Sequence, residues 1–206
     1  MAFEKEKLEH QKKSYMKRKD SMKEAIRDVN GMISLNINHG SYLELANAQN
    51  TLLKIENVQK TNLSSTLKIL LTTNGSVTRV LQTIQKSPGK KVEIKTMNQV
   101  IMGLGDEVIP GAIFESLEIP ENSTINFRKV VLHAGRKNYA LAISLTPLCR
   151  LSNEFQDDLM RADVPIGLLL EKYDIEMLRK ISIIDTCVTG SGLQKLFKIP
   201  ENTRIP

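Results

Sequence analysis

The chain has 206 residues, of which 41% are hydrophobic and 25% are charged, and its net charge is +6. This length and apolar content suffice for one sizeable domain with an appendage, but not for two full domains. No run approaches the roughly 18 apolar residues that span a bilayer, and the first six residues are not those of a signal peptide, because Glu4 and Glu6 are acidic. We therefore expect a cytoplasmic protein with no membrane partner.

The positive charge is concentrated near the amino terminus. Nine Lys or Arg and five Asp or Glu fall between Met1 and Arg27, so this segment carries +4 of the total +6. Its charges alternate in sign, as on a solvated helix face, and the chain has no Trp and few aromatic residues. Nucleic-acid surfaces combine a basic stripe with stacking rings. We expect no nucleic-acid partner, and a phosphate-binding arm is the less favoured interpretation of this segment.

Residues 1–60 are predicted to form a charged helical N-terminal extension. Apolar residues are sparse from Glu4 to Val29, which predicts a helix with little surface to bury. Breakers follow at Asn30-Gly31 and at 36–40, and Ser41 then caps a second helical pattern. These helices either pack on the domain or pair with a second copy in a homo-oligomer.

The domain proper begins near Leu63 with two helical patterns joined by a turn. The first, with Leu67, Ile69, Leu70 and Leu71, predicts a short buried helix. Asn74-Gly75 is a turn dipeptide, and Ser76 is a good N-cap for a second helix, whose apolar face is Val77, Val80, Leu81 and Ile84. The free N–H groups of this helix's first turn suit an anion, although a helix start needs no ligand to explain it.

The rest of the domain alternates strands with short helices. Val92–Ile101 and Thr124–His133 are predicted strands, and Tyr139–Pro147 is the hairpin partner of the second. A helix capped by Ser152 is predicted over Leu151–Met160, and an apolar segment follows at Val164–Leu170. No period is clear over 175–183 or 193–199. The sum predicts an α+β fold, an antiparallel β-sheet with flanking helices.

The titratable residues form no catalytic or metal-binding pattern. Cys149 and Cys187 lack C-x-x-C spacing and a nearby His cluster, so we expect two reduced, mostly buried thiols and no metal. The three His residues are scattered, and Ser76 has no evident His or Asp partner, which argues against a nucleophilic mechanism.

Arg128 is the candidate for binding an anion. Strand alternation places it on one face with Asn126, Val130 and Leu132, a mostly apolar set that would normally be core. A buried, unpaired Arg costs several kcal/mol, so Arg128 must meet an anion. The pattern alone favours an internal salt bridge to Asp or Glu over a carboxylate ligand.

Four segments in this order resemble the chorismate pyruvate-lyase family, in its archaeal and actinobacterial branch: Leu70–Arg79, Ile125–Leu132, Tyr139–Pro147 and Val164–Leu170. The resemblance covers about 63–206 and implies a chorismate lyase-like domain over 61–206. It also implies an enzyme that eliminates pyruvate from chorismate and leaves 4-hydroxybenzoate, without a metal or an organic cofactor.

The resemblance also implies the site residues. Arg128 falls at the family's carboxylate-binding arginine and would be the catalytic residue. Main-chain groups of Ile166 and Gly167, expected in an extended or turn conformation after Pro165, would contact the substrate. The turn Ser76, Val77 and Thr78 would close the other side. From the residues alone, a Pro-started helix with Gly167 allowing close packing is an equally good interpretation.

The chain departs from the family at three places. Leu168 stands where the family often has Arg, and Ile143 stands where bacterial members have another Arg. The family pattern also continues past Pro206 into a hairpin carrying a glutamate, so we expect the domain to be C-terminally incomplete. The alternatives to a lyase are a non-catalytic module that binds small aromatic acids, with the related effector-binding fold of GntR-type regulators, and an inactive relative that self-associates through its N-terminal helices.

Overall fold

A computed structural model describes residues 16–17, 20–21, 23–24, 58–59, 63–85, 91–103, 117–120, 122–177, 179, 181, 187–188, 191–200 and 203–205. The helical pattern predicted after Ser41 lies outside these residues.

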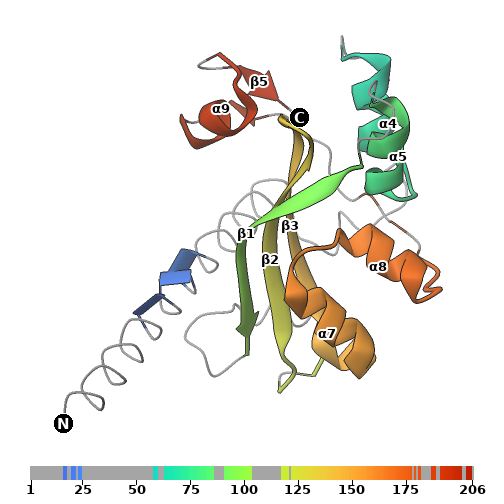
Figure 1. Ribbon diagram of the computed structural model, residues 1–206, viewed down its shortest axis with the longest axis vertical. Helices are drawn as coiled ribbons and strands as arrows, with labels where there is room; N and C mark the ends of the chain where they lie inside the picture. The colour runs from blue at the N-terminus through green and yellow to red at the C-terminus, as the bar shows by residue number, and fades with distance from the viewer. Residues whose placement is uncertain are drawn as a thin grey trace.

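A three-stranded antiparallel sheet in the order β1-β2-β3 stands at the centre of the molecule (Figure 1). Its strands are β1 (Glu93–Met102), β2 (Ile125–Ala134) and β3 (Lys137–Pro147). β2 and β3 form a hairpin, and Gly135 in its turn has a φ of 58°, a left-handed conformation that glycine adopts without strain. All three strands form where the sequence predicted them, and the α+β fold is confirmed.

The pairing of β1 with β2 contains an irregularity that decides which side chains share a face. Thr96 pairs with Val130, but the register shifts before Asn98, and Gln99 rather than Asn98 shares a face with Arg128, its cross-strand partner. An extra residue in one strand is a β-bulge, and it switches the alternation beyond it. Strict alternation from Thr96 would have placed Asn98 beside Arg128.

Helices α5 (Val77–Ile84) and α7 (Asn153–Arg161) begin at their predicted caps, Ser76 and Ser152, whose side chains accept backbone N–H groups. Helix α4 (Ser65–Thr72) is capped in the same way by Ser64, which was not predicted as a cap. The remaining elements are the 3₁₀ helix η1 (Leu148–Arg150), α8 (Ile166–Lys172), α9 (Ser191–Phe197) and the paired strands β4 (Cys187–Val188) and β5 (Arg204–Ile205). None of the helices in the described ranges is long and apolar enough to cross a membrane.

Different segments cover the two faces of the sheet. In Figure 1, α5, α7 and α8 lie on one side of it, and the described N-terminal helical residues lie on the other. Thr96 Oγ1 donates to the Ala162 carbonyl at 2.7 Å on the helix side. On the opposite side, Asn98 Nδ2 donates to the Ser21 carbonyl at 2.9 Å. This second face also carries a packed core of Val100, Met102, Ile119, Ile125 and Phe127.

Three local expectations were wrong. Helix α4 forms as predicted but is not buried, since it packs on α5 and leaves Leu67 38% and Ile69 52% exposed. Cys149 is a free, exposed thiol, because the 3₁₀ turn after β3 directs it outward. Ile166 is the first residue of α8 rather than an extended residue, because Pro165 has the torsions of a helix cap.

Candidate functional site

A cavity of about 730 Å³ lies between the sheet face that carries Arg128 and the helices beside it. Its walls come from the α4–α5 junction, from β2 and β3, from the start of α8 and from α9, and most of its lining is apolar. The lining residues of the strands are Ile94, Arg128, Val130, Leu132, Tyr139, Ala140, Leu141, Ala142 and Ser144.

The structure brings together all six residues that the sequence analysis singled out. Ser76, Val77 and Thr78 line the cavity from the start of α5, Arg128 from β2, and Ile166 and Gly167 from the start of α8. Segments separated by about 90 residues therefore converge on one space. That these residues bind a ligand stays a prediction.

Arg128 is almost fully buried, with 2% of its surface exposed. Its Nη2 donates to the Val164 carbonyl at 2.9 Å, and its Nε has no hydrogen-bond partner. No described Asp or Glu forms an ion pair with it, so the internal salt bridge favoured by the pattern is not seen within the described residues. Burial lowers the pKa of Arg128, and the negative charge of Asp163 opposes this shift.

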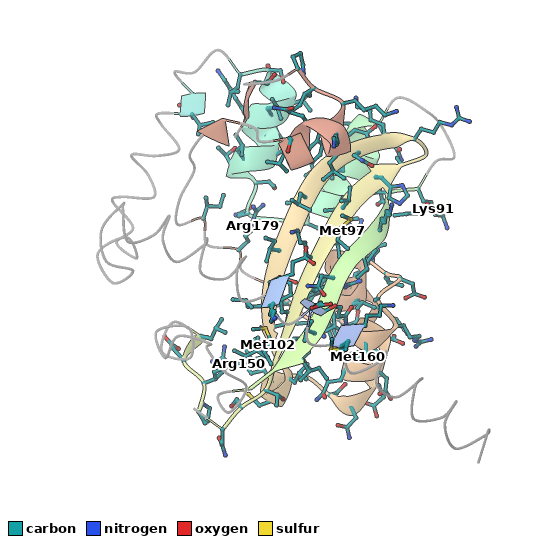
Figure 2. The ribbon with its side chains drawn as sticks, turned by 90° about the vertical axis from the view of Figure 1, so that its left-hand side faces the viewer. Lys91, Met97, Met102, Arg150, Met160 and Arg179 are labelled. Carbon is teal, nitrogen blue, oxygen red and sulfur yellow. The ribbon has the colours of Figure 1, made fainter. Side chains whose placement is uncertain are left out.

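The same face holds the other buried polar atoms that lack partners in the described part of the chain. These atoms are Gln99 Oε1 and Asn126 Oδ1, in addition to Arg128 Nε. The amide nitrogens of Gln99 and Asn126 point to the sulfur of Met160, at 3.4 and 3.0 Å, and a thioether is a weak acceptor. Figure 2 shows Met160 at the end of the sheet where α7 lies. Native proteins leave few buried polar groups unpaired. Of these three residues, only Arg128 lines the cavity, so Arg128 Nε is the unpaired atom that faces a ligand site.

The start of α5 offers a second set of donors. Ser76 Oγ accepts the Arg79 N–H at 3.4 Å, and the Ser76 carbonyl accepts the Val80 N–H at 3.1 Å. The N–H groups of Val77 and Thr78, in the first turn, have no acceptor within the helix. These donors and the positive end of the helix dipole therefore lie at the cavity wall.

At Gly167, α8 lies close to the start of α5. A Cβ at this position would stand 2.9 Å from Ser76 Oγ and 3.4 Å from Thr78 Oγ1. The two helices are also joined by Arg79 and Glu171, which form a two-point ion pair with an Nε–Oε2 distance of 3.2 Å. The close-packing interpretation of Gly167 is thus what the structure shows, and a main-chain contact with a ligand is a separate prediction.

Sequence reasoning missed Arg179, a second arginine that lines the cavity. Its Nη1 donates to the carbonyl of Thr73, at the end of α4, at 3.1 Å. It belongs to a stretch with no hydrophobic period, so no local signal assigned it to the site. Leu193, Phe197 and Ile199, from α9 and the residues after it, were likewise not predicted to reach the cavity.

An antiparallel sheet backed by helices, with a largely apolar cavity beside a buried arginine, defines the class of this α+β protein. The family model "Chorismate pyruvate-lyase Rv2949c-like" matches residues 71–203, and the chain belongs to this family. It is also similar to a putative lyase of Methanocaldococcus jannaschii, with 29% identity over 136 residues. That match covers 64% of this chain and 61% of the relative, so the chain spans less than two thirds of the relative's length.

Proposed function

We propose that the protein is a chorismate lyase, which eliminates pyruvate from chorismate to give 4-hydroxybenzoate. The observation that carries the proposal is Arg128, which is buried at the cavity wall without an ion-pair partner among the described residues. A buried cation of this kind is costly unless an anion compensates it. A carboxylate ligand supplies that anion, and family membership points to chorismate.

The reaction places modest chemical demands on the protein. The bond between the ring carbon and the ether oxygen breaks, and the neighbouring ring carbon that bears the hydroxyl loses its proton. The enolpyruvyl group leaves with the ether oxygen and takes up a proton on its methylene carbon to become pyruvate. The ring becomes aromatic, so the driving force is large and no strong base is needed. Holding the substrate in a reactive geometry and balancing the charge of its carboxylates are the contributions expected of the site.

The cavity has features suited to those contributions. Apolar side chains of β2 and β3, such as Val130 and Ala142, offer a surface for the ring beside Arg128. The free N–H groups of Val77 and Thr78 are donors for an oxygen atom on the opposite wall. The six residues Ser76, Val77, Thr78, Arg128, Ile166 and Gly167 are the proposed substrate contacts.

The direct test is to incubate the purified chain with chorismate and to measure 4-hydroxybenzoate and pyruvate. We expect the two products in equal amounts, at a rate above the spontaneous reaction, and we expect Arg128→Met to return the rate to that background. Tight binding of 4-hydroxybenzoate without turnover would instead favour the non-catalytic module related to GntR-type effector domains. If the purified chain showed neither turnover of chorismate nor binding of 4-hydroxybenzoate, the lyase and the non-catalytic binding module would both be refuted.

A further inference from the structure

The charged side chains among the described residues that line the cavity are two arginines, Arg128 and Arg179. No Asp, Glu or Lys is among these lining residues. A largely apolar space with two fixed positive charges is complementary to a dianion, since each unpaired cation in an apolar setting needs its own anion. The cavity therefore carries one more positive charge than a monocarboxylate such as 4-hydroxybenzoate would neutralise.

The two arginines reach the cavity from different walls. Arg128 is anchored at the Val164 carbonyl, just before α8, and its cross-strand neighbour Gln99 donates to the Leu159 carbonyl of α7. Arg179 is anchored at the Thr73 carbonyl, just after α4. Figure 2 shows Arg179 toward the end of the sheet where α4 and α9 lie, whereas Met160 marks the end where α7 lies. Two anionic groups separated across one ligand fit this arrangement.

One donor of Arg179 is occupied by the Thr73 carbonyl, and the structure gives no partner for its other donors within the described residues. A guanidinium has five N–H donors in a fixed fork, so the bond to Thr73 orients the group without using up its capacity. Thr73 stands three residues before Ser76, and both flank the junction that lines the cavity. Arg179 is thus a half-buried, oriented cation beside the start of α5.

We propose that Arg179 is a specificity-determining residue that binds the second carboxylate of a dianionic substrate, the one on the enolpyruvyl ether, while Arg128 binds the ring carboxylate. This inference rests on the proposed function. The ring carboxylate is assigned to Arg128 because that residue lies on the strand whose apolar side chains, Val130 and Leu132, line the same wall. The product 4-hydroxybenzoate keeps only the ring carboxylate, so Arg179 distinguishes substrate from product.

The test compares a monoanion with a dianion in calorimetric titrations of the full chain. The monoanion is 4-hydroxybenzoate, and the dianion is 3-(carboxymethoxy)benzoate, which carries a ring carboxylate and an ether-linked carboxylate in the meta arrangement of chorismate and cannot eliminate. We expect Arg179→Met to weaken binding of the dianion by about 10- to 100-fold, the range for a lost charge-assisted hydrogen bond. Binding of 4-hydroxybenzoate should change by less than about 3-fold.

Two further variants separate a ligand contact from a structural tether. Arg150→Met is the matched control, because Arg150 also donates to backbone carbonyls, those of Leu117 and Glu118 at 2.8 and 2.9 Å, but does not line the cavity. It should leave both affinities unchanged. Arg179→Lys keeps the charge and should bind the dianion better than Arg179→Met but less well than the parent, with 4-hydroxybenzoate unaffected.

The role of Arg179 would be overturned if its Met and Lys variants lost affinity for both ligands in equal measure, or lost affinity for neither. If Arg179→Met fails to fold, an Arg179→Lys variant that binds both ligands like the parent overturns it as well. Arg128→Met should lose both ligands. If Arg128→Met binds both ligands as tightly as the parent, the proposed function fails. If Arg128→Met loses affinity and the Arg179 variants do not, only the inference about Arg179 fails.

Discussion

Phe127 and Arg128 are neighbours on β2, are both almost fully buried, at 0% and 2% exposure, and lie on opposite faces of the sheet. Phe127 packs in the core with Val100, Met102 and Ile125. Arg128 opens onto a cavity. Equal burial thus accompanies different surroundings, and burial alone does not separate a packing position from a binding position.

The two faces differ more clearly in whether their buried polar groups have hydrogen-bond partners. Asn98 is buried on the packed face, at 6% exposure, and its amide nitrogen donates to the Ser21 carbonyl. On the cavity face, Gln99 Oε1, Asn126 Oδ1 and Arg128 Nε are buried without partners in the described part of the chain. A folded protein tolerates such atoms where a ligand or water completes them. This difference in hydrogen bonding supports the proposal that the cavity face is the functional one.

The largest expected effect on stability comes from the packed face. Phe127→Ala should lower the free energy of unfolding by about 3–5 kcal/mol, because it leaves a cavity in a filled core. Urea denaturation measures this, and Phe127→Leu is a milder variant for ligand titration. Phe127→Leu should bind 4-hydroxybenzoate within about 3-fold of the parent. If it lost the ligand as fully as Arg128→Met, the two faces would not be functionally separate.

On the cavity face, Arg128→Met should weaken binding of 4-hydroxybenzoate by about 10- to 100-fold and should not lower the melting temperature. The pKa of Arg128 is lowered by burial, so its charged form is disfavoured in the folded state. That penalty is present at every pH below the folded pKa and disappears only as the pH rises through it. Met removes the penalty at neutral pH and keeps most of the packing. A marked loss of stability would reveal a structural ion pair instead.

A smaller effect is expected where the helices meet beside the cavity. Gly167→Ala should cost about 0.5–2 kcal/mol, because the new Cβ displaces Ser76 Oγ and weakens the cap of α5. Ser76→Gly removes that oxygen, and glycine is nearly as good a cap as Thr. A double-mutant cycle by thermal unfolding should therefore show that Gly167→Ala costs less in the Ser76→Gly background. Strict additivity would mean that the close approach does not set the identity of residue 167.

The smallest effect lies away from both faces, at the first turn of α7. Hydrogen bonds from its own backbone N–H and from the Ser152 hydroxyl lower the pKa of Glu154. A lowered folded pKa stabilises the protein above the unfolded pKa, and this contribution is lost as the pH falls through the folded pKa. Glu154→Gln should thus lower the melting temperature slightly at pH 7 and not at acidic pH. The exposed Glu176→Gln is the control, and an equal shift in both variants would exclude a specific cap.

Local chemistry made part of this structure predictable. Ser76 and Ser152 cap helices as their sequence context indicated, since a cap depends on residues within one turn. Arg128 stood out because a charge in an alternating apolar strand is a local anomaly. A local anomaly of this kind is therefore enough to single out one face of β2 from the sequence.

Features set by tertiary contacts were not predictable in the same way. The apolar pattern of α4 does not reveal that Ile69 stays exposed, because that depends on which surfaces α5 and the sheet leave uncovered. The bulge before Asn98 moves Gln99 to the cavity face without a glycine or other marker in β1. Arg179 is held at the cavity by its hydrogen bond to Thr73, more than 100 residues earlier in the chain. Local periodicity does not predict a contact between residues so far apart in sequence.

The central claim is that Arg128 binds the carboxylate of an aromatic acid in this cavity. A crystal structure of the full chain with 4-hydroxybenzoate tests it most directly. The account predicts the ring against the apolar strand residues and a carboxylate oxygen within hydrogen-bond distance of Arg128 Nε, the donor that has no partner in the described residues. A ligand bound elsewhere, or bound here with its carboxylate away from Arg128, would contradict it.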